Sequence, residues 1–213
     1  MLEIEPDGER VEVVGSNALR DLARLGRLDL AMLVVLATAA RAGESPLSPT
    51  AIARRMGHPS CDGALARRIR EAGDRLAEPR ILRIAFDLAG GGRVRPSFAA
   101  WADDAGGGYR LDVAWWPLAE AGWPAVAAAD LRTRASSLPG RRLVLWADLA
   151  RRGGQSVAVD ALGLEGVLGI ESPRPRRRAA LWAEAADDLA ALLPGVTLWT
   201  DGPVVRLEAR SRV

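Results

Sequence analysis

The sequence predicts an α+β chain, mostly helical, that is built from two tandem winged helix-turn-helix units. Two observations support this prediction. The order helix, helix, tight turn, helix, hairpin can be read once in each half of the chain. Residues 56–76 also align with residues 168–189 with a single one-residue gap, so that the glycines and apolar positions of the two segments coincide. The chain is therefore interpreted as two copies of one unit.

The first helix of the first unit is predicted from the apolar stretch 28–41, which is too long for a typical strand and is typical of a buried helix. Ser48 and Pro49 predict the start of a second, short helix, because serine caps helix N-termini and proline is favoured at the first helical position. Gly57 is the expected end of this helix.

The third helix of the first unit is predicted for residues 62–78, where apolar residues recur with helical periodicity. The segments 81–88 and 93–98 flank three glycines and predict a hairpin, which would be the wing. A further strand is expected at residues 109–113, followed by a mostly helical connector at 115–137.

The second unit predicts the same kinds of element in the same order, at residues 141–152, 159–168, 174–193, 196–200 and 203–208. Ser172 and Pro173 repeat the serine–proline start of a helix, and Asp201-Gly202 is a turn-forming pair. The predicted organisation is a partly disordered N-terminal segment, a first winged-helix domain, a connector and a second winged-helix domain, at residues 1–27, 28–118, 119–138 and 139–213.

Composition excludes several classes of function. The chain has 213 residues and a net charge of +2, and all 29 basic residues are arginine. Without lysine there is no phosphate-binding loop of the GxxxxGK[ST] type and no Schiff-base cofactor site. A single histidine, His58, and a single cysteine, Cys61, exclude the usual multi-ligand zinc site and a disulfide framework. We therefore expect no cofactor and no bound metal.

The sequence also predicts where the protein acts. The longest strongly apolar run is too short to span a bilayer, and the N-terminus is acidic where a signal peptide is basic. We expect a soluble, cytoplasmic protein with no membrane partner. Because His58 would be the only base of a catalytic triad and no GxSxG motif is present, we expect no enzymatic activity.

Positive charge is concentrated in two blocks. Residues 48–95 carry ten arginines against five acidic residues, and residues 139–178 carry eight against four. Such an arrangement steers polyanions even when the net charge is small. The alternative is that the two blocks are solvated helical faces in a protein from a GC-rich genome, and charge alone leaves both interpretations open.

The position of the arginines on the third helices favours DNA binding. In a helix-turn-helix, the N-terminal part of the second helix of the motif lies closest to the base edges of the major groove. On a helical projection, Arg67 and Arg70 lie opposite the apolar stripe of the first unit, and Arg68 lies on its flank. In the second unit, Arg176 points away from the apolar stripe and Arg177 lies beside it.

Further arginines are candidates for phosphate contact. Arg93 and Arg95 lie on the expected wing, and Arg174 and Arg178 belong to the proline-interleaved segment 172–178, which is either a flexible basic arm or a helix start. For Arg54 and Arg55 of the short helix, phosphate contact and simple solvation remain equal alternatives. The candidate DNA-binding residues are Arg67, Arg68, Arg70, Arg174, Arg176, Arg177, Arg178, Arg93 and Arg95.

Seven tryptophans suggest a stacking surface for single strands, but core packing is the favoured interpretation for Trp146, Trp182 and Trp199. The connector tryptophans, Trp115, Trp116 and Trp123, are expected to pack the two units together or to form a partner surface. His58 is interpreted as a structural residue of the turn and Cys61 as a small buried residue.

Three stretches of the second unit, 137–146, 155–164 and 175–189, resemble the C-terminal winged helix of plasmid replication initiators of the TrfA type. The resemblance implies a protein that binds repeated origin sequences (iterons) on double-stranded DNA, helps to open the adjacent duplex and recruits host replication proteins. It also implies a change between a homodimer and a monomer. It assigns the recognition-helix role to Arg174, Arg176, Arg177 and Arg178, and through the internal repeat to Arg67, Arg68 and Arg70. The chain departs from the family in lacking lysines and in carrying Glu184, Asp187 and Asp188 on the last helix.

Two other functions remain open at this point. A transcription regulator with tandem winged helices would have the same sequence features, and only neighbouring direct repeats beside an AT-rich segment would separate it from an initiator. A winged-helix adaptor of a chromosome-condensing complex would bind protein instead of DNA and would use the connector tryptophans as its interface.

Overall fold

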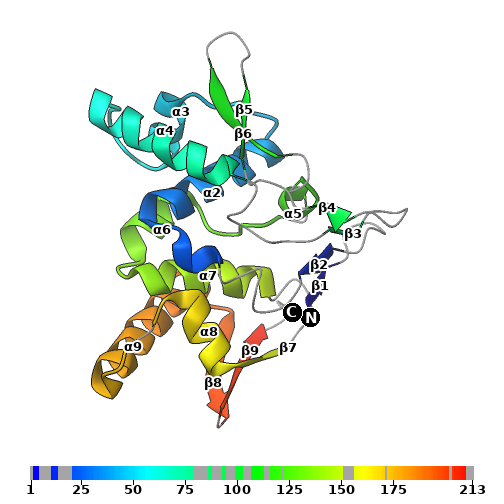
Figure 1. Cartoon of the computed structure of the whole chain (residues 1–213), viewed down its shortest axis with the longest axis vertical. Helices are drawn as coiled ribbons and strands as arrows, with labels where there is room; N and C mark the ends of the chain where they lie inside the picture. The colour runs from blue at the N-terminus through cyan, green and yellow to red at the C-terminus, as the bar shows by residue number, and fades with distance from the viewer. Residues whose placement is uncertain are drawn as a thin grey trace.

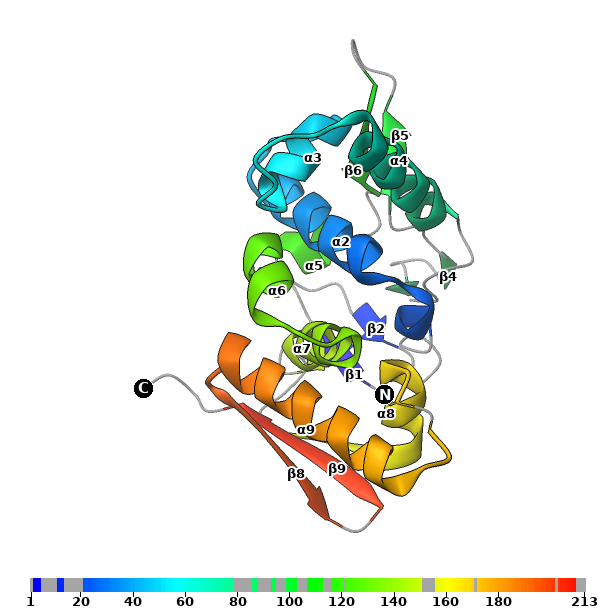
Figure 2. The same cartoon turned by 90° about the vertical axis from the view of Figure 1, so that its left-hand side faces the viewer.

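The computed structural model describes residues 2–4, 11–13, 21–78, 86–87, 93–94, 99–102, 107–112, 116–120, 122–150, 156–170, 172–201 and 203–209. The chain is α+β and mostly helical, as the sequence predicts. Figures 1 and 2 show one group of helices with a hairpin at the top, a second group with a small sheet at the bottom, and short helices between them. None of the described helices combines the length and the apolar character needed to span a bilayer.

The upper group contains three helices and one hairpin: α2 (Arg27–Arg41), α3 (Pro49–Arg55), α4 (Gly63–Ala77), β5 (Ala99–Ala102) and β6 (Gly108–Leu111). The predicted starts of α3 and α4 are confirmed by their caps. The Ser48 hydroxyl accepts a hydrogen bond from the Ala51 amide at 3.3 Å, and the Asp62 carboxylate accepts one from the Leu65 amide at 2.7 Å.

A single bridge connects the loop before α3 to this hairpin. The backbone groups of Leu47 and Tyr109 exchange hydrogen bonds of 2.8 and 2.9 Å, so Leu47 acts as a one-residue strand beside β6. Since β6 also pairs with β5, the order across the sheet is Leu47, β6, β5.

Tyr109 positions α4 against this hairpin. Its hydroxyl donates to Asp74 Oδ1 at 2.7 Å and lies 3.1 Å from the backbone oxygen of Arg70, and its ring packs against Gly73. Burial, with the Asp74 carboxylate nearby, raises the pKa of Tyr109 above its usual range, so the hydroxyl stays a donor. The strand predicted at 109–113 is confirmed as β6, and it sets the position of α4.

The lower group contains three helices and a three-stranded sheet: α7 (Leu138–Ala150), β7 (Ser156–Asp160), α8 (Ala161–Leu168), α9 (Pro175–Leu192), β8 (Val196–Asp201) and β9 (Val204–Ala209). All strand pairs are antiparallel and the order is β7-β9-β8, so the last strand lies in the middle. Figure 2 shows α9 crossing one face of the β8–β9 hairpin.

The remaining described elements precede, interrupt or connect the two groups: β1 (Leu2–Ile4), β2 (Val11–Val13), η1 (Asp21–Arg24), β3 (Phe86–Asp87), β4 (Arg93–Val94), α5 (Trp116–Glu120) and α6 (Ala128–Arg134). The expectation of a mostly helical connector is met by α5 and α6. The buried apolar side chains form one cluster that extends from η1 and α2 through α6 and α7 to β9. The two groups therefore share a continuous core.

Four predictions of element position differ from the structure. The helix predicted from residue 141 begins at Leu138, because the Ser137 hydroxyl accepts a hydrogen bond from the Gly140 amide at 2.9 Å and caps it. The last long helix is capped at Arg174 with Pro175 in its first turn, so the start at Ser172 and Pro173 is wrong. Strand β7 occupies part of the segment predicted as loop and short helix.

The fourth difference concerns the first hairpin. β3 and β4 pair antiparallel over two residues each within the segments predicted as a hairpin, which confirms the pairing, and the other residues of these segments lie outside the described part of the chain. The hairpin that packs on α4 is β5–β6. Its inner side chains, Tyr109 and Leu111, are buried while Arg110 between them is exposed, so period-two alternation holds this strand against the core.

Candidate nucleic-acid interface

The third helix of the upper group exposes the arginines that the sequence singles out. Arg67, Arg68 and Arg70 are all exposed on α4, outside the buried stripe that includes Ile69. The Arg67 side chain is 74% exposed and its Nε lies 3.8 Å from Glu71 Oε1, a surface pair that contributes little energy. These guanidinium groups therefore lie on the surface and not in the core.

The turn before α4 is held by an arginine from the connector. Gly57 adopts a positive φ of 80° at the end of α3, a conformation that favours glycine. Arg132 of α6 donates to the backbone oxygens of Met56 and Gly57 at 2.8 and 3.0 Å. Burial, followed by the cations Arg132 and Arg68, lowers the pKa of His58 in this turn. The imidazole is consequently neutral at pH 7, and the positive charge here comes from arginine.

The third helix of the lower group repeats this arrangement. Arg174, Arg176 and Arg177 are exposed at the N-terminal end of α9, where the orphan amides of the helix also favour anions. Arg178 is partly covered, and its Nε lies 3.7 Å from Glu165 Oε1 of α8. Within the part of the chain that the structure describes, neither Arg176 nor Arg177 has an ion-pair partner.

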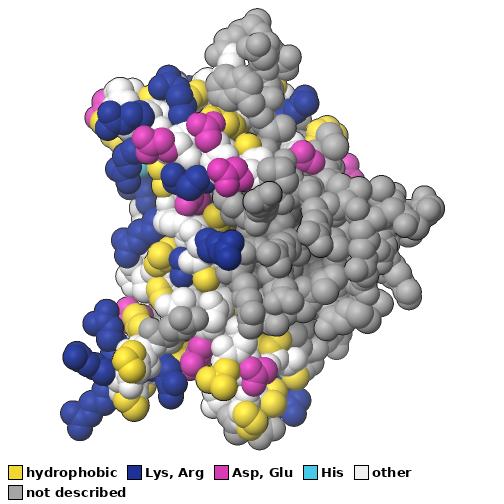
Figure 3. Space-filling view, viewed as in Figure 1, with side chains coloured by type: hydrophobic (Ala, Val, Ile, Leu, Met, Phe, Trp, Pro, Cys, Tyr) yellow, Lys and Arg dark blue, Asp and Glu magenta, His cyan; other side chains and the backbone are white. Residues whose placement is uncertain are grey.

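The two arginine-bearing helices face the same side of the molecule. Figure 3 shows basic side chains along its left-hand edge, over α4 near the top and over α9 at the bottom, as located in Figure 1. Acidic side chains interrupt this edge between the basic ones. The two helices that carry the candidate arginines, α4 and α9, therefore lie at one edge of the molecule.

The wing candidates are only partly described. Arg93 lies in β4 and pairs across the hairpin with Asp87 in backbone register, whereas Arg95 lies outside the described residues. Arg54 and Arg55 lie at the end of α3; Arg54 is exposed and Arg55 forms an ion pair with Glu44. Arg55 is therefore already engaged in an ion pair within the chain, at its surface.

Other arginines of the basic blocks serve the fold, which the sequence does not reveal. Arg75 bonds to the buried carboxylate of Asp29 at 2.6 Å. Arg141 and Arg142 are buried, and their guanidinium groups donate to backbone oxygens: Arg141 to those of Arg132 and Ala135. Burial lowers the pKa of both groups. Arg141 and Arg142 therefore cap helix C-termini.

Arg142 joins three chain segments. Its guanidinium donates to the Leu168 oxygen at the end of α8 at 2.8 Å, and to the Ala23 and Leu25 oxygens at the end of η1 at 2.6 and 2.9 Å. The C-terminal carbonyls of a helix carry partial negative charge, which offsets the burial of this cation. The segment before α2 is thereby fastened to the lower group.

The tryptophans divide between core and surface. Trp146 is buried, as expected, and Trp123 is buried with its Nε1 3.4 Å from the Leu145 oxygen of α7.

The core assignment is wrong for Trp199, which is 43% exposed on β8, and Trp182 is only partly buried. Trp116 is 45% exposed on α5, and Trp115 lies outside the described residues. Cys61 is half-buried, more exposed than expected.

The structure contains a pocket beside Trp182 and Trp199 that the sequence does not predict. It lies between α8, α9 and the β8–β9 hairpin and has a volume of about 400 Å³. The alternation along β8 accounts for the exposure of Trp199, because Val196 and Leu198 turn inward. The pocket itself forms where α8, α9 and the hairpin meet, which no local signal in the sequence indicates.

Comparison with protein-family models, with curated proteins and with solved structures gives no match to this chain. The similarity to plasmid replication initiators therefore stays a prediction. Among the described residues, no group of three or more His, Cys, Asp or Glu side chains is placed to hold a metal ion.

Proposed function

We propose that the chain binds double-stranded DNA through two tandem winged-helix units at residues 28–118 and 139–213, with α4 and α9 as recognition helices. The element order supports this proposal. In each half a helix, a strand, two helices and a closing hairpin follow in this order, with β3 and β4 inserted before the hairpin of the first half, and the last strand lies in the middle of its sheet. In the first half the strand is reduced to Leu47. Residues 119–138 then form the connector.

The observation that carries the proposal is the shared edge of the two arginine-bearing helices. Exposed guanidinium groups occupy α4 at Arg67, Arg68 and Arg70, and the first turn of α9 at Arg176 and Arg177. Guanidinium groups of this kind bind phosphate, and they bind guanine O6 and N7 with two hydrogen bonds.

The surface of α9 beside these arginines favours close approach to bases. Ala179, Ala180 and Ala183 are exposed and small, so they leave room for a base edge or a thymine methyl group. Further along the same helix, Glu184 and Asp187 are exposed and repel phosphate, whereas Asp188 is buried and acts in the fold. The N-terminal half of α9 is the part that would enter the groove.

Within DNA-binding proteins, we favour a cytoplasmic plasmid-type replication initiator that recognises origin repeats and engages host replication proteins. The support is the resemblance of the second unit to such initiators. A tandem winged-helix transcription regulator would use the same two helices, and direct repeats beside an AT-rich segment would distinguish the initiator from it.

The first test measures binding of duplexes that have been selected from a random pool. We expect a long selected site that spans two adjacent grooves. Arg176→Ala should weaken binding to that site by about 1–3 kcal/mol and relax the preference at one position if the residue reads a base. Fluorescence anisotropy at several salt concentrations checks both effects.

The control is Arg41→Ala, which removes an exposed arginine at the end of α2, outside both recognition helices. It should leave the selected site and its affinity unchanged. If Arg176→Ala weakens all sequences equally and flattens the salt dependence, its role is phosphate contact alone. Absence of salt-sensitive duplex binding would overturn the proposal in favour of the protein-binding adaptor.

A further inference from the structure

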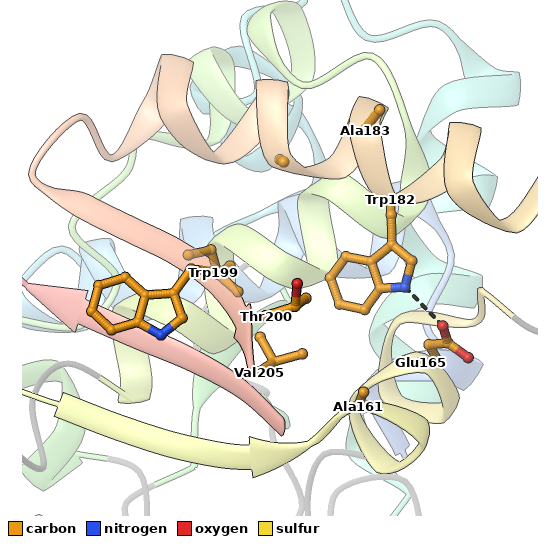
Figure 4. Close-up of a pocket in the computed structure, with 9 residues that line it drawn as sticks. Ala161, Glu165, Trp182, Ala183, Trp199, Thr200 and Val205 are labelled. Carbon is orange, nitrogen blue, oxygen red and sulfur yellow. Dashed lines mark hydrogen bonds between the residues drawn. The ribbon is translucent and has the colours of Figure 1, made fainter. Parts of the chain in front are cut away.

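The pocket beside α9 is open to the surface at the side of the second unit. Figure 4 shows Trp182 pointing from α9 into it, with Ala161 and Glu165 of α8 on one side and Thr200 and Val205 of the hairpin below. Trp199 lies at the opposite end, on β8. With a volume of about 400 Å³, it can take a large side chain together with part of the backbone that carries it.

The walls of the pocket are mainly apolar. Its aliphatic lining comes from Ala161, Ala183, Ala186, Leu198 and Val205. The main polar groups inside are already engaged with each other, because the Trp182 indole N–H donates to Glu165 Oε1 at 2.8 Å and Arg178 Nε lies 3.7 Å from the same oxygen.

One exposed large apolar side chain lines the pocket. Among the described residues, the large hydrophobic side chains that are exposed are Trp116, Leu162 and Trp199. Trp199 lines the pocket, and Leu162, which is 71% exposed, directly follows Ala161 of its wall. Exposed apolar surface around a concave site is typical of a protein-binding surface.

The chemistry of the walls favours an apolar side chain over a nucleobase. A base carries donors and acceptors around its edge, and each of these groups loses free energy when it is buried without a partner. Only the Thr200 hydroxyl and the engaged Glu165 carboxylate offer side-chain oxygens among the lining residues. An aromatic or branched aliphatic side chain needs no such partner.

The charge around the pocket favours an acidic neighbour for that side chain. Arg178 lies one helical turn before Trp182 on the same face of α9, and Arg174 lies one turn further toward the N-terminus. Glu165 is the opposing charge, and its carboxylate lies close to Arg178. Two arginines against one carboxylate leave a net positive charge beside the pocket at this end of α9.

We infer that this pocket binds a peptide segment of a protein partner, in which a Trp, Phe or Leu side chain enters between Trp182 and Trp199 and adjacent Asp or Glu residues face the arginines of α9. Trp182 lies on a different face of α9 from Arg176 and Arg177, and the pocket adjoins the proposed DNA-reading face at Ala183, which lines it. The second unit then holds a protein partner beside its DNA surface.

Synthetic fluorescent dodecapeptides test this inference directly. One series carries a central Trp, Phe, Leu or Ala between acidic residues, and a second series carries the same centres between lysines. We expect the acidic peptides with a large apolar centre to bind at least tenfold more tightly than the Ala-centred and the lysine-flanked peptides. Fluorescence anisotropy with the full chain measures each affinity.

Four variants locate the binding. Trp199→Ala removes an exposed wall, Ala186→Phe fills the pocket from an exposed helix position, and both should weaken the best peptide at least tenfold. Trp116→Ala removes an equally exposed tryptophan on α5 and should leave the affinity unchanged. Arg178→Gln should abolish the preference for acidic flanks while the preference for a large centre remains.

Several results would overturn the inference. Equal affinities across the peptide series, or unchanged binding in the Ala186→Phe variant, would show that the pocket is not a peptide site. Binding of an oligo(dT) probe that Trp199→Ala abolishes would assign the pocket to a nucleobase. A dimer that Ala186→Phe converts to a monomer would assign it to a second copy of the chain. None of these readouts depends on duplex binding, so the two proposals fail separately.

Discussion

The ring of Tyr109 lies against Gly73, and this pair determines how closely β6 and α4 approach. A Cβ atom at Gly73 would overlap the ring, whereas the backbone of this glycine is ordinary α-helix. The position therefore needs glycine for space and not for backbone conformation, although glycine inside a helix costs about 0.5–1 kcal/mol relative to alanine.

Gly73→Ala should lower the free energy of unfolding by about 1–3 kcal/mol, because the overlap with Tyr109 outweighs the gain in helix propensity. Urea unfolding followed by far-UV circular dichroism measures the change. The matched control is Gly63→Ala in the same helix, where a Cβ atom meets no neighbour within 4 Å. It should be neutral or slightly stabilising. A Gly73→Ala variant as stable as Gly63→Ala would contradict the packing argument.

The buried carboxylate of Asp188 joins two helices at the element scale. It belongs to α9 and accepts hydrogen bonds from the amides and hydroxyls of Ser136 and Ser137, at 2.8 to 3.2 Å, directly before α7. An anion at a helix N-terminus satisfies orphan amides and interacts favourably with the helix dipole. Of the three acidic residues by which α9 departs from the plasmid initiators, Asp188 is therefore a structural cap.

Asp188→Asn should destabilise the protein by about 1–3 kcal/mol, since the amide nitrogen cannot accept hydrogen bonds from the serine amides and the negative charge is lost. Differential scanning calorimetry would register the loss as a lower Tm. Asp187→Asn changes an exposed neighbour on the same helix and should leave the Tm within experimental error. Equal Tm values for the two variants would show that the cap contributes nothing.

At this scale the sequence predicts helices well and strands less well. The apolar stretch of α2 and the caps of α3 and α4 are local signals, and all three helices are found where they are expected. β7 has no such signal, because its short alternating residues become a strand only through pairing with β9, far along the chain. The β5–β6 hairpin depends in the same way on a distant partner, because Tyr109 of β6 pairs with Leu47.

The fold of the whole molecule depends on buried arginines. The sequence does not distinguish these arginines from the ones on the surface. Arg142 and Arg176 lie in the same basic block, yet one is buried among backbone oxygens and the other is exposed. Which of them acts in the fold is decided by the positions of η1 and α8, and these are properties of the tertiary structure. The candidate DNA-binding residues of α4 and α9 could be predicted because helical periodicity alone places them on the outer face.

Arg142→Met should lower the free energy of unfolding by about 3 kcal/mol or more, because three carbonyl oxygens lose their donor in a buried site. Chemical denaturation monitored by tryptophan fluorescence tests this. Arg177→Met removes an exposed arginine of the same block and should stay within about 0.5 kcal/mol of the wild-type protein. Matching stabilities of the two variants would mean that the junction of η1, α7 and α8 carries no net energy.

Because Arg142 connects η1 with α8, it also affects how the protein would bind a long ligand. Arg142 holds the chain just before α2 on the lower group, while Arg132 reaches from α6 to the turn of the upper one. These two sets of hydrogen bonds restrict movement of the upper group of helices relative to the lower group. If a duplex contacted α4 and α9 together, the protein would fix the distance between its two contact sites. The DNA would then have to supply the curvature or the half-site separation that fits this distance.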